Sequence, residues 1–412
     1  MHREIDCLIV GSGMGSVTCG TALAQRGWRV LLLTPGALED SFYRVQDGFE
    51  HDRSPDLLWG LEEGGFLHPL LATEEQPPVV RLQPGVQVVL PCHRVGLYGP
   101  GPDWERELRR EFSSSWSDIL ICSEALCQLS EVIWARMETP LWTMARWSSS
   151  RLDGKRHLRT FLRERGITPP FCDMAEAVAA ACFGVDPSQA TVAMAAMAFG
   201  HARKGFFAPR GGSKAFIERP ILRFQALGGE IRGGVVREIT VRWNAIREVA
   251  MADGEVVSAR YVVWEPDPGP QDRVLHLLVD EAWIPGEMGR NVLLVEAERS
   301  GEAPPGLLHL ALGVVGDADE RSSRKRAVAI RVLRAPRRDP VSLLDEAFPG
   351  WAGAQTCPVP PRPARPADFP LTRRWPHPRN LLVISHESPL GRGHSAAAWN
   401  GHRIATRLLS RA

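Results

Sequence analysis

The beginning of the chain joins apolar runs through a glycine turn, and this pattern predicts a strand, a turn and a helix. Residues 6–10 (DCLIV) are largely apolar and predict a strand that is buried on both faces. The turn 11–16 (GSGMGS) leads into a helix expected at about 14–26, which Gly27 ends. Residues 29–33 (RVLLL) predict a second, parallel strand. This order of elements indicates a dinucleotide-type α/β fold, whereas a glycine turn without a ligand is the simpler alternative.

The glycine turn is also the first candidate binding site. Gly11 suits a tight turn, Gly13 lets a pyrophosphate approach the backbone, and Ser16 is small enough for the helix to pack on its strand. Backbone amides at the start of that helix would face the phosphates. The residues expected to contact a nucleotide here are Gly11, Ser12, Gly13, Met14, Gly15 and Ser16.

One position departs from the usual dinucleotide site. An Asp or Glu normally follows the second strand and hydrogen-bonds the adenosine ribose. Thr34 stands at that place. A threonine hydroxyl can make this hydrogen bond, but without the charge that strengthens it. The sequence therefore leaves nucleotide binding open.

Helical patterning dominates the first half of the chain after the second strand. Two apolar runs, 79–82 and 86–90, predict a hairpin across Pro84-Gly85. Apolar residues then recur at helical spacing from Asp103 to Trp147, and helices are expected to continue to about residue 201. The tryptophans of this region most simply form core, with the lining of a lipophilic tunnel as the alternative. They are Trp116, Trp134, Trp142 and Trp147.

The second half returns to strands. Residues 231–264 alternate as strands, and residues 292–333 suggest an antiparallel sheet with a helix near Leu343. The proline-rich stretch 358–377 predicts an extended connector. A last strand is expected at 380–385 and a helix at about 395–409. We expect the two chain ends to build one nucleotide-binding sheet, with the middle of the chain as a separate domain over the site.

This layout predicts a fold class and domain boundaries. The fold is expected to be α/β, with a Rossmann-like FAD/NAD(P)-binding domain assembled from discontinuous segments, and a mixed α+β substrate domain with a helical block. The Rossmann domain is expected to comprise residues 1–60, 205–270 and 378–412. The substrate or cap domain is expected to comprise residues 61–204 and 271–357, with the connector at 358–377.

Charge and composition narrow the classes of function. The 49 Lys and Arg residues nearly cancel the 48 Asp and Glu residues, which gives no electrostatic case for nucleic acid. The eight cysteines contain no CxxC pair, so neither a metal site nor a disulfide framework is expected, and a cytoplasmic location is the plain interpretation. No secretory signal layout and no run of about 20 apolar residues is apparent. Contact with a membrane surface stays open.

Several short motifs together resemble the phytoene desaturase and flavin amine oxidase superfamily, which binds FAD in the manner of glutathione reductase. The resemblance rests on 9–16, on Gly48-Phe49 with Asp52, on 208–212 (APRGG), on 228–231 leading to Val236, on Asp253-Gly254 with 262–263 and Asp267-Pro268, and on 380–383 with Gly391, Gly393 and Gly401. It implies that FAD is the cofactor. It also implies that Val236 meets the adenine and that the helix after Gly393 points its amino end at the flavin.

The departures from the family pattern concern polar contacts to the cofactor. The family's acid after the second strand is Thr34, and its Arg-Gly-Gly-Arg-like clamp has no match between Thr34 and Asp47. The aspartate that follows the last strand aligns with His386. His386 and His394 flank the predicted Gly391–Gly393 loop, where they are either near a flavin or simply at the entry to a helix. No catalytic residue is assigned.

Two functions are consistent with these observations. The first is an FAD-dependent oxidoreductase of desaturase, isomerase or oxidase type, acting on a lipophilic, isoprenoid or polyene small molecule. The second is a non-catalytic protein of the same fold that has lost FAD and binds a lipid or a protein partner, in the manner of the Rab GDP-dissociation inhibitors, which use the fold that the resemblance implies without a flavin. Nicotinamide binding is a weaker third alternative, because no second glycine-turn βαβ unit is present. The sequence identifies neither the substrate nor the oligomeric state.

Overall fold

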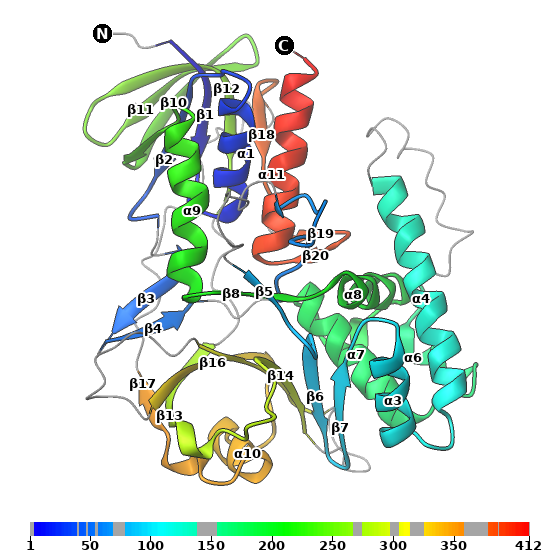
Figure 1. Ribbon diagram of the computed structural model, residues 1–412. Coiled ribbons are helices and arrows are strands. Elements are labelled where there is room, and N and C mark those ends of the chain that lie inside the picture. The colour runs from blue at the N-terminus through cyan, green and yellow to red at the C-terminus, as the bar shows by residue number, and fades with distance from the viewer. Residues whose placement is uncertain are drawn as a thin grey trace.

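The computed structural model describes residues 4–38, 41–46, 48–53, 57–68, 79–137, 155–266, 274–296, 305–313, 325–357, 378–385 and 387–411. These residues form two large sheets and a block of helices. The first sheet and its helices lie at the top of Figure 1, the second sheet lies below them, and the helical block lies beside both.

The first sheet is built from both ends of the chain. Its main path runs β10-β11-β12-β1-β2-β9, and β18 pairs with β12. The strands β18, β12, β1, β2 and β9 pair in parallel, whereas β10 and β11 extend β12 as an antiparallel meander. The bounds are β1 Glu4–Val10, β2 Val30–Thr34, β9 Glu230–Gly233, β10 Val236–Arg242, β11 Ala245–Met251, β12 Val256–Trp264 and β18 Leu381–Val383.

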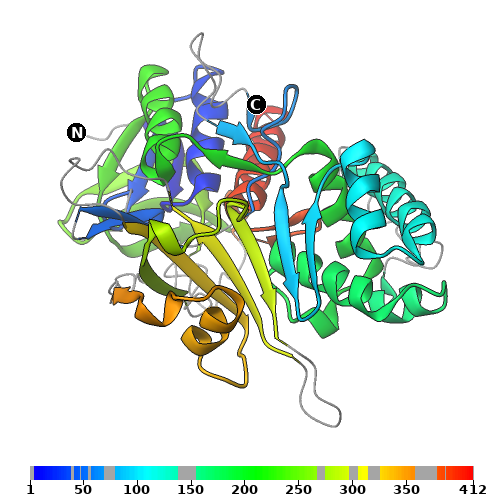
Figure 2. The ribbon, with the colours of Figure 1, turned by 60° about the horizontal axis from the view of Figure 1, so that its bottom comes forward.

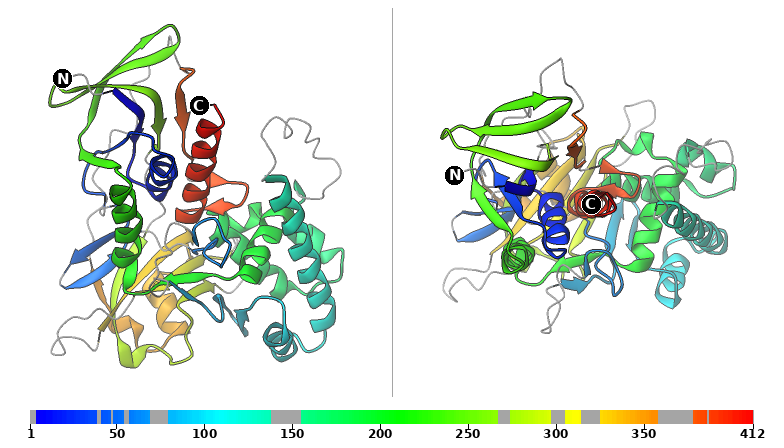
Figure 3. Two further views of the ribbon diagram at one scale, coloured as in Figure 1. Left: turned by 45° about the horizontal axis from the view of Figure 1, so that its top comes forward. Right: turned by 90° about the horizontal axis from the view of Figure 1, so that it is seen from above.

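Three helices accompany this sheet: α1 (Met14–Ala24), α9 (Gly212–Ala226) and α11 (His394–Leu409). Helices α1 and α11 lie side by side in both views of Figure 3, although they come from opposite ends of the chain. Buried residues of β1, α1 and α11, such as Ile9, Val17 and Leu408, share one apolar core. The prediction that the two chain ends meet in one sheet is therefore confirmed.

The second sheet lies below the first sheet in the view of Figure 1. Its order is β17-β13-β16-β15-β14-β6-β7, and in Figure 2 its strands lie between the first sheet and the helical block. The predicted antiparallel pairing of β14, β15 and β16 is confirmed. Helix α10 (Pro340–Ala347) packs Leu343 and Leu344 into the core of this sheet. The bounds are β6 Val86–Leu90, β7 His93–Leu97, β13 Val274–Asp280, β14 Asn291–Val295, β15 Leu307–Leu312, β16 Lys325–Arg334 and β17 Gln355–Cys357.

The helical block packs against one edge of the second sheet. Buried side chains of its helices join those of β6 and β14, including Val86 and Leu293, in one core. Trp116 and Trp134 are partly buried against that core, which favours the packing interpretation for these two, while Trp142 and Trp147 lie outside the described residues. The helices are α3 Pro102–Glu111, α4 Trp116–Met137, α6 Leu158–Arg163, α7 Pro169–Phe183 and α8 Val192–Lys204.

Short elements connect these three parts, and one of them corrects a prediction. The expected hairpin of 79–82 with 86–90 does not form. Instead, β5 (Val79–Arg81) pairs with β8 (Phe207–Pro209), and β6 pairs with β7 and β14. The other short elements are β3 Tyr43–Gln46, β4 Phe49–Asp52, β19 Glu387–Ser388, β20 Gly391–Arg392 and the 3-10 turns η3 Pro187–Gln189, η4 Glu281–Trp283 and η5 Trp351–Gly353.

The α/β fold class predicted from the sequence is confirmed, with one parallel-centred sheet, one mainly antiparallel sheet and a helical block. The exact domain boundaries stay a prediction, and the connector 358–377 lies outside the described residues. Within the described part of the chain, no helix has the length and apolar character that crossing a bilayer requires.

Candidate functional site

The glycine turn lies where the sequence predicts it, between β1 and α1. Gly13 is the residue before the first turn of α1, and no side chain of the turn itself caps that helix. The predicted contact residues Gly11, Ser12, Gly13 and Met14 are all buried, as are Gly15 and Ser16. The first backbone amides of a helix lack partners within the helix and carry partial positive charge. This turn is therefore an anion-binding cradle in its backbone geometry.

The cradle is occupied by a side chain of the protein itself. One carboxylate oxygen of Glu265, Oε2, accepts hydrogen bonds from the backbone amides of Gly13, at 2.9 Å, and of Ser16, at 3.0 Å. Glu265 directly follows β12 and is 5% exposed. Its own amide donates to the carbonyl of Val10, so the backbone continues the parallel pairing of β12 with β1. The carboxylate is thus held at the amino end of α1.

The glycines of the turn have no side chains, and the Glu265 side chain occupies the space that this leaves. A Cβ built on Gly11 would lie 2.6 Å from the Cβ of Glu265. A Cβ on Gly13 would fall onto its carboxylate, and one on Gly15 would lie 2.9 Å from Oε1. Real Cβ atoms essentially never approach other atoms within 3.0 Å. In this structure the small residues are required by packing within the protein.

The segment after β2 lies against the same turn. The hydroxyl of Ser41 donates to that of Ser12 at 2.9 Å, and Phe42 is 2% exposed. The hydroxyl of Thr34, at the predicted ribose position, donates to the carbonyl of Arg232 on β9 at 3.5 Å. The side chain of Thr34 is thereby directed to the backbone of the neighbouring strand.

Of the remaining predicted contact residues, the two that the structure describes, Val236 and Gly393, lie around the same edge of the first sheet. Val236 is half-buried at the start of β10, two residues after Gly234, whose amide donates to the carbonyl of Thr34 at the end of β2. Gly393 precedes α11 with φ +86°, a conformation that favours glycine. His386 lies outside the described residues. His394 begins α11, and its ring lies 4.9 Å from that of Phe42.

A second helix in this region also begins at a carboxylate from another element. Glu50 of β4 accepts a hydrogen bond from the amide of Lys214, in the first turn of α9, at 3.1 Å. Burial raises the pKa of Glu50, an effect that the backbone amides oppose. Asp52, also on β4, accepts a hydrogen bond from the hydroxyl of Ser213. The Pro-x-Gly-Gly segment before α9 is therefore closed by acidic side chains.

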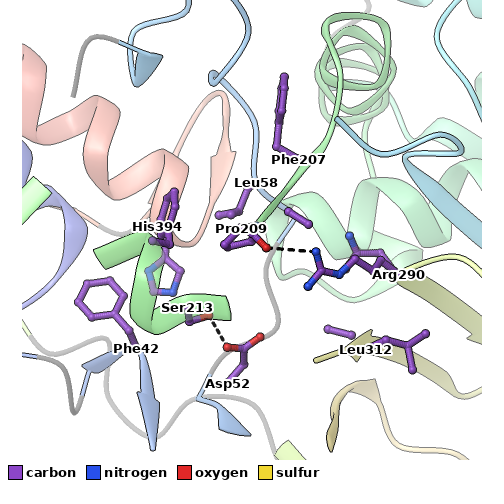
Figure 4. Close-up of a pocket in the computed structure, with 13 residues that line it drawn as sticks. Phe42, Asp52, Leu58, Phe207, Pro209, Ser213, Arg290, Leu312 and His394 are labelled. Carbon is purple, nitrogen blue, oxygen red and sulfur yellow. Dashed lines mark hydrogen bonds between the residues drawn. The ribbon is translucent and has the colours of Figure 1, made fainter. Parts of the chain in front are cut away.

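A pocket opens beside these residues, between the two sheets and the segment around β8. In Figure 4, His394, Phe42 and the Ser213–Asp52 pair gather on one side, and Arg290 lies across from them. Arg290 donates to the carbonyl of Pro209 at 3.2 Å, and burial lowers its pKa, against the opposing charge of Asp52. The walls combine apolar and polar surface in nearly equal parts. They comprise Phe42, Leu58, Phe207, Ala208, Pro209, Phe216, Ala311 and Leu312, with the polar residues Asp52, Ser213, Arg290, Asn291 and His394.

The geometry allows a direct test of whether FAD fits. The backbone of the cradle fits a phosphate, because two amides already converge on one anionic oxygen. The side chains do not fit one in this arrangement, because a pyrophosphate would need the same amides that Glu265 holds. A second anion at this buried position would also be repelled by that carboxylate. A dinucleotide therefore requires Glu265 to move.

Comparisons of the sequence find distant relatives, and no family model matches the chain. The sequence is 24% identical over 264 residues to an inactive all-trans-retinol 13,14-reductase of Danio rerio. It is 36% identical over 70 residues to a chloroplastic prolycopene isomerase of Daucus carota. These alignments cover 55% and 16% of this chain, but only 41% and 11% of the two relatives. The chain thus matches less than half the length of each of these proteins.

Comparisons of the structure match the chain along nearly its whole length. An oxidoreductase of Methanosarcina mazei aligns with 98% of this chain and 99% of its own, with a TM-score of 0.64 and 14% identity. Cyclohexylamine oxidase of Brevibacterium oxydans gives 0.58 and 14%, covering 99% of both chains. Rab GDI of Plasmodium falciparum gives 0.56 and 11%, covering 99% and 98%. The chain therefore has the same fold as this oxidoreductase and this amine oxidase. The resemblance that the sequence motifs indicated is therefore confirmed for the fold.

Sequence reasoning missed Glu265, which is the residue that decides the chemistry of the cradle. A signal for it was present, because an acid directly follows the buried strand 261–264. The carboxyl ends of parallel strands meet at one edge of a sheet. An acid at the end of β12 therefore lies beside the turn that follows β1, once β12 and β1 are known to be neighbours. That neighbour relation comes from the structure.

Proposed function

We propose that this chain is an FAD-dependent oxidoreductase that acts on a lipophilic small molecule of the isoprenoid or polyene class. The observation that carries the proposal is the geometry of the backbone cradle: the amides of Gly13 and Ser16 converge on one anionic oxygen at the amino end of α1. The near-complete structural match to an oxidoreductase and to an amine oxidase supports it. So do the names of the sequence relatives, which refer to retinol and prolycopene.

The pocket beside the cradle supports a lipophilic substrate. Phe207, Phe216 and Leu58 offer apolar walls, which bind hydrocarbon and exclude water. Arg290 and Asp52 supply opposite charges within the same pocket and would orient a polar end group. The amino end of α11, at His394, faces this pocket from the first sheet. The roles of individual residues in catalysis are left unassigned.

An absorption spectrum of the purified protein tests this function. The flavin bands of an oxidised cofactor, either present on purification or gained after incubation with FAD, are expected. Reduction of the bound flavin by retinol, but not by a hydrophilic alcohol, would then support the substrate class. A colourless protein that also fails to bind added FAD would overturn the proposal.

A second function is favoured by the position of Glu265. A protein that fills its own pyrophosphate site can keep the fold without a cofactor, and then use the apolar pocket to bind a lipid or a lipid-bearing partner. The match to Rab GDI, at a TM-score of 0.56, supports this alternative as far as the fold is concerned. Retinol fluorescence tests it directly. A colourless protein that enhances retinol fluorescence, and loses this effect when Phe207 is replaced by Asp, would favour the second function.

A further inference from the structure

Glu265 behaves toward the glycine turn as a bound phosphate would. Its carboxylate receives two backbone amides at 2.9 and 3.0 Å, and it lies at the positive end of the α1 dipole. Hydrogen bonds to an ionised acceptor are about twice as strong as neutral ones. We propose that Glu265 is an internal anionic ligand that closes the dinucleotide cradle and competes with the pyrophosphate of any nucleotide for the same two amides.

The backbone around Glu265 keeps this ligand in place. The amide of Glu265 donates to the carbonyl of Val10 at 2.9 Å, and the next strand pairing, from Ile384 to the carbonyl of Trp264, fixes the residue before it at 2.8 Å. The carboxylate is therefore carried at the end of a central strand. An ordinary helix cap comes from the residue just before its helix, whereas this one comes from a residue 252 positions from Gly13.

The glycines of the turn gain a second explanation from this arrangement. Glycines in a dinucleotide turn normally admit the pyrophosphate. Here a Cβ on Gly11 would meet the Cβ of Glu265, and a Cβ on Gly13 would meet its carboxylate. Gly13 is thus required by the internal ligand, whereas a Cβ on Gly11 would also meet the Ser16 hydroxyl, and one on Gly15 would also meet Ile384. Packing within the protein therefore accounts for the glycine pattern, and its presence does not by itself indicate a bound cofactor.

A second contact closes the turn from the side of the segment after β2. Ser41 donates to Ser12 at 2.9 Å, and both residues are buried. Phe42 packs next to them and against the His394 ring at the start of α11. The closure therefore involves three segments of the chain: the turn itself, the end of β12 and the segment 41–42.

The inference goes beyond the proposed function, because it concerns control of the cradle whether or not the protein uses a flavin. A purely structural cap predicts that removal of the carboxylate only lowers stability. Competition predicts in addition that the cradle gains affinity for an external anion. These two consequences are separated by measuring stability and ligand binding on the same variants.

The experiment compares the unmodified protein with Glu265→Ala and Glu265→Gln. Isothermal titration with ADP, inorganic pyrophosphate and FAD measures binding, and thermal unfolding is followed with and without each ligand. Glu265→Ala is expected to bind ADP and pyrophosphate at least about tenfold more tightly than the unmodified protein, because the internal competitor is gone. Its melting temperature should rise with added pyrophosphate, since a ligand of the folded state stabilises it. Glu265→Gln keeps an uncharged acceptor at this position, so its affinity for ADP and pyrophosphate is expected to increase less.

Glu296 supplies a matched control. It is 3% exposed, directly follows β14, and its Oε2 accepts from the amides of Gly306, at 3.0 Å, and Arg337, at 3.1 Å. Glu296→Ala and Glu296→Gln therefore remove the same kind of bonds from the second sheet. They are expected to lower stability without changing nucleotide binding.

The outcomes distinguish this inference from the proposed function. A gain in ADP or pyrophosphate affinity in the Glu265 variants, and not in the Glu296 variants, supports the inference. Equal affinity in the unmodified protein and in both Glu265 variants overturns it, and so does a complete lack of binding in all of them. If Glu265→Ala does not fold, Glu265→Gln decides by the same criterion. Flavin bands in the unmodified protein support the proposed function whichever way this test falls.

Discussion

Gly13 shows how one side chain changes the meaning of a sequence motif. In an empty cradle, a methyl group at this position would cost little, since the φ angle of Gly13, −92°, is open to any residue. With the Glu265 carboxylate in place, the same methyl group has no room. The requirement for glycine at position 13 therefore depends on a residue that is remote in the sequence.

Replacing Gly13 by Ala is expected to destabilise the protein by about 1–3 kcal/mol, because the Glu265 carboxylate must shift and weaken its hydrogen bonds to the backbone amides. The loss should be smaller when Glu265 is replaced by Ala in the same molecule, because the clashing group is then absent. Urea unfolding of the two single variants and the double variant measures this coupling. Gly36→Ala is the control, since a Cβ there would meet nothing within 4 Å. Additive effects of the two substitutions would contradict the clash.

His276 gives the protein a pH dependence that can be assigned to one group. It lies on β13, is 6% exposed, and its ring meets that of His51 edge-on at 5.5 Å. Burial, helped by the charges of His51 and Arg53, lowers the pKa of His276 to about 4. The unfolded chain binds a proton near pH 6.5, whereas the folded chain binds it only near pH 4. Between these values the unfolded state holds more protons, so stability falls as the pH falls.

We therefore expect His276→Phe to lose stability less steeply than the unmodified protein between pH 6.5 and pH 4. The difference in slope is expected to approach about 1.4 kcal/mol per pH unit. Urea midpoints at several pH values measure it. His201, whose pKa burial also lowers to about 4, is present in both proteins and cancels in the comparison. Parallel slopes would show that His276 does not titrate in this window.

The sequence predicts elements best where the signal is local. The strand, glycine turn and helix at the start of the chain follow from a continuous run of residues, and β1 and α1 lie where that run predicts them. The predicted hairpin across Pro84-Gly85 failed because pairing partners are not local: β5 pairs with β8, more than a hundred residues away. The sequence did not predict that Glu265 lies at the glycine turn for the same reason, since its position depends on β12 being the neighbour of β1.

The crossing of α1 and α11 depends on close approach of their backbones. A Cβ on Gly401 of α11 would fall onto the carbonyl oxygen of Gly15 in α1. In an exposed helix, replacement of glycine by alanine normally stabilises by about 1 kcal/mol. Here the change would instead force the two helices apart. The sign of the effect is thus a test of the packing.

Gly401→Ala is expected to destabilise the protein by about 1–3 kcal/mol, because the backbone of Gly15 cannot move aside as a flexible side chain would. Arg407→Ala, on the exposed side of α11, is the control and should stay within about 0.5 kcal/mol. Chemical unfolding monitored by circular dichroism measures both. A stabilised Gly401→Ala protein would show that the two helices do not meet at this point.

At the scale of the whole molecule, the last segment of the chain joins the parts together. Leu390, between β19 and β20, belongs to the core of the helical block, as do Ala396 and Trp399 of α11. The carbonyl of Leu390 lies 2.6 Å from Nε2 of His201 on α8. The same core includes Leu293 and Leu307 of the second sheet. Residues 390–399 therefore pack into the core of the helical block, whose other residues come mainly from the middle of the chain.

This continuity predicts that the protein unfolds as one cooperative unit, although its first sheet and its helical block come from different segments. Leu390→Ala should cost about 2–5 kcal/mol, as for other fully buried leucines. The urea midpoints measured by far-ultraviolet circular dichroism and by tryptophan fluorescence should fall together, since coincident transitions mark two-state unfolding. Separate midpoints for the two signals would show that the helical block is an independent unit, and that Leu390 stabilises only the interface between it and α11.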